Sequence, residues 1–207
     1  LNWHLGQADE PMVVKSVEYV PDTFHARHST KLKTYVYRIL TQEQQYVPKG
    51  GRGPHYPLLG DNLWWHSMPL NVSLMKEASK MFEGTHNFAS FRSSRCEAVS
   101  TVRDIKQFQL TQQPLPFELA NTPNLQLLHF TVKSRAFLHL QVRCMVGGVV
   151  AVGSGQITLE RLKQIMDAKS ESVKKYVAPA EGLYLAEVEY SSSENNEPSN
   201  VLEEDLE

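Results

Sequence analysis

The sequence predicts an α+β fold in which an antiparallel sheet carries helices on one face. Two kinds of pattern predict it: alternating apolar residues that are typical of strands, and apolar stripes at helical spacing. Along the chain strands come first, then a helix, two strands, helices and a last strand, which is an order typical of α+β folds. The second half of this order resembles a split βαβ, ferredoxin-like unit.

Two strands are predicted near the N-terminus. Met12–Val20 has the composition of a strand, and Phe24–Leu40 is an entry loop followed by a second strand. In this second strand Tyr35, Tyr37 and Ile39 fall on one face, because successive side chains of a strand point to opposite faces. The tyrosine-bearing face is therefore expected to point inward.

A helix is predicted after a long loop, rich in glycine and proline, that spans residues 41–62. Asn71 is a suitable N-cap, and Gly84 lies where a C′ glycine ends a helix. Its apolar stripe consists of Leu74, Met75, Ala78, Met81 and Phe82.

Two further strands, Thr101–Leu110 and Leu125–Ser134, are predicted to form a hairpin with a long loop. Three residues of the second strand, Leu128, Phe130 and Val132, are expected to be buried on one face.

The last third of the chain predicts two helices and a strand. The stretch LHLQVRCMVGGVVAVGSG is typical of a buried helix, which Gly147 and Gly148 weaken unless close packing requires them. An amphipathic helix begins at Thr158, and a closing strand runs from about Leu183 to Tyr190.

The charge is distributed unevenly along the chain. Residues 191–207 contain six of the 23 acidic residues and no lysine or arginine, so residues 1–190 carry 17 acidic against 21 basic residues, about +4. We expect residues 1–190 to form one domain and residues 191–207 to be a disordered acidic tail. A mildly basic body permits an RNA or phosphate partner, but an ordinary solvated surface explains the charge equally well.

Other classes of function receive no support from the sequence. The two cysteines, Cys96 and Cys144, have no metal-ligand neighbours at a usual spacing and are expected to be reduced thiols. The eight histidines form no metal-binding pattern, so no metal is predicted. The sequence contains no apolar run of membrane-span length and no recognisable signal peptide at its start.

Arg143 is the most informative single residue, because nearly all its neighbours in HLQVRCMVGG are expected to be buried. A buried guanidinium must be paired. One interpretation is a structural salt bridge with Glu181 or Glu187; the other is an arginine in a cleft that holds a catalytic carboxylate or a phosphate.

The segment before and within the second strand offers further candidates. Tyr37 is interpreted as a core residue whose hydroxyl is satisfied at the edge, whereas Tyr35 could stack on an unstacked base or handle a proton. The nearby cations Arg27, Lys31 and Lys33 are either surface charges or contacts to a phosphate backbone.

Taken together, these motifs resemble a known family. Four stretches resemble the successive signatures of the TruA-type tRNA pseudouridine synthases, in the family's order: FHARHSTKLKTYVYRI, EGTHNFASFR, AFLHLQVRCMVG and APAEGLYL. The similarity runs from about Leu1 to Tyr190. It implies half of a pseudouridine synthase core, and an enzyme that isomerises uridine to pseudouridine in tRNA without cofactor or metal, commonly as a homodimer. The target base would be flipped into a pocket.

The resemblance also assigns roles. Tyr35 matches the first tyrosine of the family's Tyr-x-Tyr motif, which lies near the flipped base and is a candidate for proton abstraction at C5. Arg143 matches the arginine that pairs with the catalytic aspartate. These two are the catalytic candidates, and the RNA-binding candidates are His25, Arg27, Lys31 and Lys33.

One departure from the family is large. The family's catalytic aspartate lies in an Arg-Thr-Asp-Ala-Gly-Val-His stretch that this sequence lacks, and Asp104, which follows Arg103, is not expected to replace it. We therefore expect a C-terminal fragment that makes no pseudouridine alone, from an intracellular protein, either cytoplasmic or mitochondrial. The alternatives are a non-catalytic RNA-binding module and a ferredoxin-like interaction domain.

Overall fold

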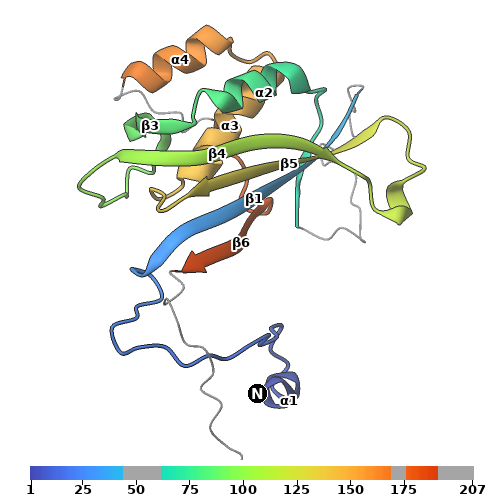
Figure 1. Cartoon of the computed structure of the whole chain (residues 1–207). Coiled ribbons are helices and arrows are strands. Elements are labelled where there is room, and N and C mark those ends of the chain that lie inside the picture. The colour runs from blue at the N-terminus through green and yellow to red at the C-terminus, as the bar shows by residue number, and fades with distance from the viewer. Residues whose placement is uncertain (44–61, 169–175, 191–207) are drawn as a thin grey trace, which may run out of the picture.

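The computed structural model describes residues 1–43, 62–168 and 176–190 of the chain (Figure 1). Its helices are α1 (Asn2–Gln7), α2 (Val72–Lys80), α3 (Gln141–Gly153) and α4 (Leu159–Ala168), with short 3₁₀ turns η1 (Ala89–Phe91) and η2 (Phe117–Leu119). Its strands are β1 (Thr30–Gln42), β2 (Trp64–His66), β3 (Gly84–Asn87), β4 (Val102–Gln113), β5 (Leu125–Ser134) and β6 (Leu183–Tyr190). Residues 44–61 of the loop predicted at 41–62, and the predicted acidic tail, lie outside the described residues.

The strands form one sheet in the order β2-β1-β5-β4-β3, with β6 also paired to β1. β1 runs antiparallel to β5 and β6, and β4 runs antiparallel to β3 and β5, so the sheet is mainly antiparallel, as predicted. The short strands β2 and β3 were not predicted. The short strand β2 is an exception, because it pairs with the end of β1 in parallel. More than a dozen residues separate these two strands, which is enough chain for the crossover that a parallel pair requires.

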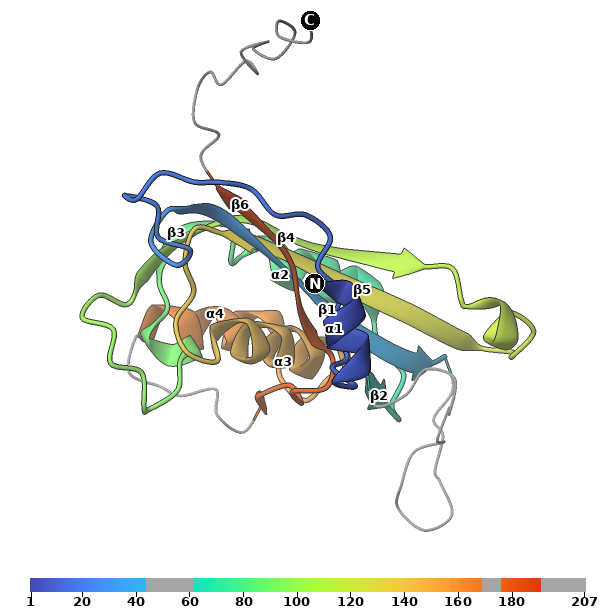
Figure 2. The same cartoon turned by 90° about the horizontal axis from the view of Figure 1, so that it is seen from below.

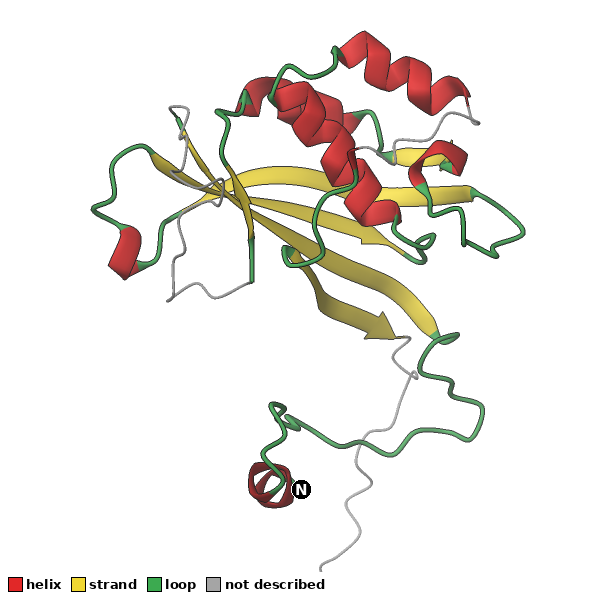
Figure 3. Ribbon diagram, turned by 180° about the vertical axis from the view of Figure 1, so that it is seen from behind, coloured by secondary structure: helices red, strands yellow, loops and turns green. Residues whose placement is uncertain are grey.

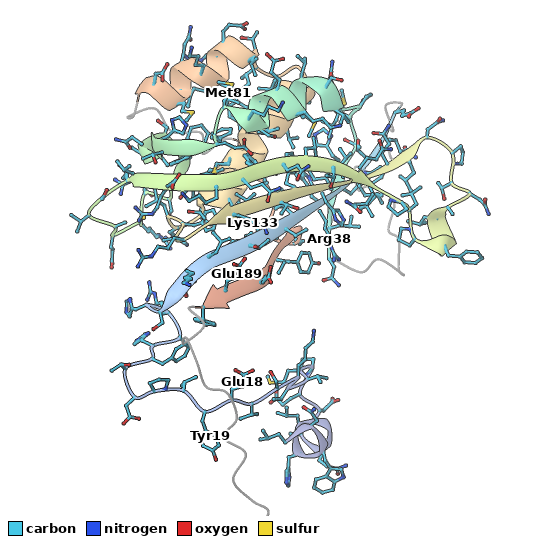
Figure 4. The ribbon with its side chains drawn as sticks, in the orientation of Figure 1. Glu18, Tyr19, Arg38, Met81, Lys133 and Glu189 are labelled. Atoms are coloured by element: carbon cyan, nitrogen blue, oxygen red, sulfur yellow. The ribbon has the colours of Figure 1, made fainter. Side chains whose placement is uncertain are left out.

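The predicted α+β architecture is confirmed: α2, α3 and α4 cover one face of the sheet (Figures 1 and 3). Leu128, Phe130 and Val132 of β5 are fully buried beneath them, as the alternation predicts. The alternate residues point the other way: Lys133 of β5 and Arg38 of β1 lie on the face away from the helices, whereas Met81 lies in the helical layer (Figure 4). The core therefore lies between the sheet and the three helices.

Helix α2 has the predicted N-cap and a narrower apolar stripe than predicted. The Asn71 side chain accepts a hydrogen bond from the backbone N–H of Leu74 at 3.0 Å. Met75, Ala78 and Phe82 are fully buried, while Leu74 is 40% exposed. The prediction that Gly84 is the C′ residue is wrong, because the helix ends at Lys80 with Met81 as its C-cap. Gly84 is the first residue of β3, and its backbone φ of +92° explains why a glycine stands there.

We expect Asn71→Ala to lower the free energy of unfolding by about 1 kcal/mol, because it removes the cap from the first turn of α2. Urea denaturation followed by circular dichroism measures the change. Asn71→Asp is the matched control, since its carboxylate keeps the acceptor and should retain the stability. Equal losses in both variants would show that the cap hydrogen bond does not stabilise α2.

The predicted strand at Met12–Val20 is wrong. The segment pairs with no described strand, and its backbone near Val14 instead exchanges two hydrogen bonds with the side chain of Asn2, at 2.8 and 2.9 Å. Val17 is 75% exposed, and Tyr19 lies fully in solvent (Figure 4). Strand-like composition is insufficient here, because a strand needs a partner edge to satisfy its backbone groups. Helix α1, which the patterns did not predict, lies beyond this segment (Figure 3).

Candidate nucleic-acid interface and catalytic residues

The main candidate interface is a cavity of about 650 Å³ at one end of the sheet, which we call the basic cavity. Ser134, at the end of β5, pairs with both Lys33 of β1 and Ile105 of β4, so these three strands meet there (Figure 1). The charged residues that line it are Arg27, Lys33, Arg95, Arg103, Arg135 and Glu97. Five cations against one carboxylate give this cavity an excess of positive charge, which attracts anions.

The structure separates the four predicted RNA-binding residues. Arg27 and Lys33 line the basic cavity. Lys31 lines a neighbouring hollow of about 440 Å³ that shares Arg103 and Arg135 with it. His25 lines neither; its ring Nδ1 accepts hydrogen bonds from the backbone N–H groups of Arg27 and His28, at 3.1 and 3.3 Å. His25 therefore shapes the turn that presents Arg27.

Three cavity arginines, Arg95, Arg103 and Arg135, were missed by the sequence interpretation. A signal for two of them exists. Arg103 lies at the start of β4 and Arg135 directly follows β5, and an antiparallel hairpin brings the start of one strand beside the end of the other. The Nη1 of Arg103 donates to the carbonyls of Ser100 and Val102, at 2.9 and 2.6 Å, which fixes this side chain in the cavity wall.

Tyr35 does not line the basic cavity directly. Its ring packs edge-to-face on Phe137, with ring centroids 5.2 Å apart and an interplanar angle of 89°. Phe137 itself lines the cavity. The two rings thus lead from the cavity to the inward face of β1.

Tyr37 is a core residue with a satisfied hydroxyl, as predicted. It is fully buried, and its hydroxyl donates a hydrogen bond of 2.7 Å to the carbonyl of Pro179. Burial raises the pKa of this phenol well above its ordinary value, and the nearby charge of Arg143 only partly opposes the rise. Tyr37 therefore stays protonated.

Arg143 lies in the first turn of α3, half-buried between buried residues. Its Nε donates to the carbonyl of Ala178 at 2.7 Å, and its own carbonyl accepts from the Ala178 N–H at 3.1 Å. The two salt-bridge partners that the sequence suggested are not used: neither Glu181 nor Glu187 comes within ion-pair distance of the guanidinium. Among the described residues, its two Nη groups also donate no hydrogen bond to protein. The backbone carbonyl of Ala178 thus satisfies one edge of the guanidinium, and no group of the described residues occupies the other edge.

The described aspartates do not supply that anion. Asp104 forms an ion pair with Lys106, on its own strand, and no carboxylate of residues 1–43, 62–168 or 176–190 pairs with Arg143. The same part of the chain contains no cluster of three or more side chains that could hold a metal ion. Nor does it contain a helix of the length and apolarity needed to span a membrane.

Comparisons with known proteins agree on one family. The family model described as tRNA pseudouridine synthase matches residues 78–191. The chain is 36% identical over 202 residues to "tRNA pseudouridine synthase-like 1" of Xenopus laevis, covering 95% of this chain and 64% of that protein. It is 31% identical over 198 residues to "tRNA pseudouridine synthase A" of Allorhizobium ampelinum and 33% over 190 residues to that of Bartonella tribocorum, and it spans 68% of each. This chain therefore corresponds to about two thirds of each relative's length.

Proposed function

Because this chain belongs to the tRNA pseudouridine synthase family, we propose that it forms the RNA-binding part and one side of the active site of an enzyme that isomerises uridine to pseudouridine in tRNA. The observation that carries the proposal is Arg143. Its guanidinium is held by the carbonyl of Ala178 and has no carboxylate partner within the described residues, which fits a partner that arrives from another part of the active site.

The basic cavity would hold the RNA backbone. Two of its cations, Lys33 and Arg103, lie on strands of the sheet, and the other three lie on segments that connect its elements. Contacts of this kind position a nucleic acid without reading its sequence. Phosphates held there would place an extruded nucleotide near Phe137 and Tyr35, whose edge-to-face rings continue the cavity wall inward. Flipping is required because the reacting atoms of a stacked base are inaccessible.

The chemistry would then need two groups. A carboxylate, oriented by Arg143, assists the breaking of the bond between C1′ and N1; the base rotates, and C5 bonds to C1′. The proton on C5 is lost and N1 gains one, so the product is an isomer of the substrate. Tyr35 is the candidate to take the C5 proton, whereas Tyr37 is occupied by its hydrogen bond to Pro179.

The test is product formation on tRNA transcripts that contain no pseudouridine at the start. The protein that contains this chain is incubated with transcript, the RNA is digested to nucleosides, and chromatography separates uridine from its isomer. We expect pseudouridine to form, and Tyr35→Phe to abolish it while tRNA binding is kept. Product formation at an unchanged rate with Tyr35→Phe would remove Tyr35 from the mechanism.

A second candidate function is a non-catalytic RNA-binding module, which the lack of a carboxylate beside Arg143 in the described residues favours. It predicts salt-dependent tRNA binding and no pseudouridine from any protein that contains this chain. The same incubation therefore distinguishes the two functions. A chain that bound no tRNA at low salt would contradict both.

We expect removal of charge from the basic cavity to weaken tRNA binding and its salt dependence. The variant Arg95→Gln, Arg103→Gln, Arg135→Gln should lower the slope of log affinity against log salt by about 2 to 3, roughly 0.7–0.9 for each phosphate that the protein no longer neutralises. Fluorescence anisotropy with labelled tRNA over a salt series measures it. The matched control changes Lys76, Lys80 and Lys163 to glutamine. These lysines lie on α2 and α4 outside the cavity, so the control removes the same net charge without touching the cavity. Equal slopes in the two triple variants would show that the cavity is not the RNA site.

A further inference from the structure

The acidic residues 191–207, which we call the acidic segment, leave the fold at the rim of the basic cavity. The last residue of β6, Tyr190, pairs with Thr30 at the start of β1. Its hydroxyl donates a hydrogen bond of 2.9 Å to the carbonyl of Ala26, and its ring packs against Phe24 with centroids 5.0 Å apart. Ala26 directly precedes Arg27, and both Arg27 and Thr30 line the cavity. The end of β6 thus lies beside the start of β1 (Figures 1 and 2), next to residues that line the cavity.

The charges of the two parts are complementary. The cavity presents five cations against Glu97. The acidic segment carries six carboxylates and no lysine or arginine: Glu194, Glu197, Glu203, Glu204, Asp205 and Glu207. Seventeen residues of chain span at most about 56–61 Å when fully extended, so the segment is long enough to reach across the cavity. Because the segment begins at the cavity rim, its carboxylates are held near the cations at an effective concentration of the order of millimolar.

We propose that the acidic segment docks in the basic cavity and competes there with RNA phosphates. The docking follows from position and charge alone, whereas the competition rests on the proposed function. An RNA that makes few phosphate contacts would fail to displace the segment, while one that makes many contacts would succeed. The segment would thereby act against weakly bound RNA and increase the preference for the proper substrate.

Cys96 provides a reporter of docking that needs no RNA. It lines the basic cavity and is partly exposed, whereas the only other cysteine, Cys144, is 1% exposed. Burial opposes ionisation of the Cys96 thiol. Hydrogen bonds from the backbones of Ala98 and His139 and from the side chain of Arg92 outweigh that effect and lower its pKa, which favours reaction with thiol reagents. A segment lying in the cavity should shield this thiol.

The first experiment compares the full chain with a variant in which all six carboxylates of the acidic segment become amides. At about 50 mM salt we expect Cys96 of the neutralised variant to react roughly 3- to 10-fold faster, both with the dianion 5,5′-dithiobis(2-nitrobenzoate) and with neutral N-ethylmaleimide. The difference should vanish near 1 M salt, where the Debye length falls to about 3 Å. A full chain with the segment's residues in scrambled order is the matched control and should behave as the parent. Equal rates in parent and neutralised chains at low salt would overturn the docking.

The second experiment measures the affinity of the same chains for tRNA and for a short single-stranded RNA. We expect the neutralised variant to bind both about 3- to 10-fold more tightly at low salt, with the larger gain for the short RNA. Shielding of Cys96 with unchanged RNA affinity would overturn the competition and point to RNA binding elsewhere, while the docking would stand. Loss of tRNA binding in every chain would instead contradict the proposed function.

Discussion

Gly147→Ala is expected to prevent folding or to lower the free energy of unfolding by about 4 kcal/mol or more. A Cβ at this position would overlap the backbone carbonyl oxygen of Tyr176 and lie 2.9 Å from the backbone nitrogen of Ala178. Both are backbone atoms, and Ala178 is fully buried, so no side-chain rotation relieves the contact. The loss is comparable to the whole stability of many domains, which is about 5–15 kcal/mol.

The adjacent glycine provides a matched control on the same helix. A Cβ at Gly148 would meet Cδ1 of Leu162 at 3.1 Å and a ring carbon of Phe91 at 3.5 Å, which are side-chain atoms that can adjust. Alanine also favours a helix over glycine by about 1 kcal/mol. We therefore expect Gly148→Ala to change the free energy of unfolding by no more than about 1 kcal/mol. Chemical denaturation of both variants measures the difference, and similar losses at the two positions would contradict the assigned backbone contact.

This contact links the core to the candidate active site. Because Gly147 has no side chain, the backbone at 176–178 lies directly against α3, and the carbonyl of Ala178 reaches the Nε of Arg143. The next residue, Pro179, accepts the hydrogen bond of Tyr37. The sequence analysis expected glycines in α3 only where close packing requires them. The contact at Gly147 meets this expectation.

Most elements of the fold could be predicted because their information is local. The alternation in β5 and the apolar stripe of α2 with its N-cap each lie within about a dozen consecutive residues. The structure places both elements within a few residues of the prediction. Met12–Val20 failed for the opposite reason. Its residues favour a strand, but strand formation depends on a partner edge, which local sequence does not reveal.

The candidate site was only partly predictable for the same physical reason. Arg27 and Lys33 were found because they lie close together in sequence beside Tyr35. Arg103 and Arg135 join them through the register of β4 and β5, so they enter the cavity from more than 60 residues away. The need of Arg143 for a partner followed from burial, but that its first partner is the carbonyl of Ala178 depends on the packing of α3.

The second large effect is expected from Arg143→Gln in the protein that contains this chain. We expect kcat for pseudouridine formation to fall roughly 10²- to 10³-fold, the usual loss when a fixed group that stabilises charge is removed from an active site. KM for tRNA should change little, because Arg143 lies outside the basic cavity. Steady-state kinetics on tRNA transcripts measures both. Arg103→Gln is the contrasting variant: it should raise KM and leave kcat nearly unchanged.

A purely structural role for Arg143 would also lower activity, so the pH profile decides between the roles. If Arg143 orients an ionised carboxylate, its positive charge holds the pKa of that carboxylate down. Arg143→Gln would then raise this pKa and shift the acidic limb of the kcat profile to higher pH, because the reaction needs the ionised form. Arg143→Lys keeps the charge but loses the fork geometry, so it should restore the position of the limb and only part of the rate. Loss of kcat with an unmoved acidic limb in Arg143→Gln would mean that the arginine only anchors Ala178.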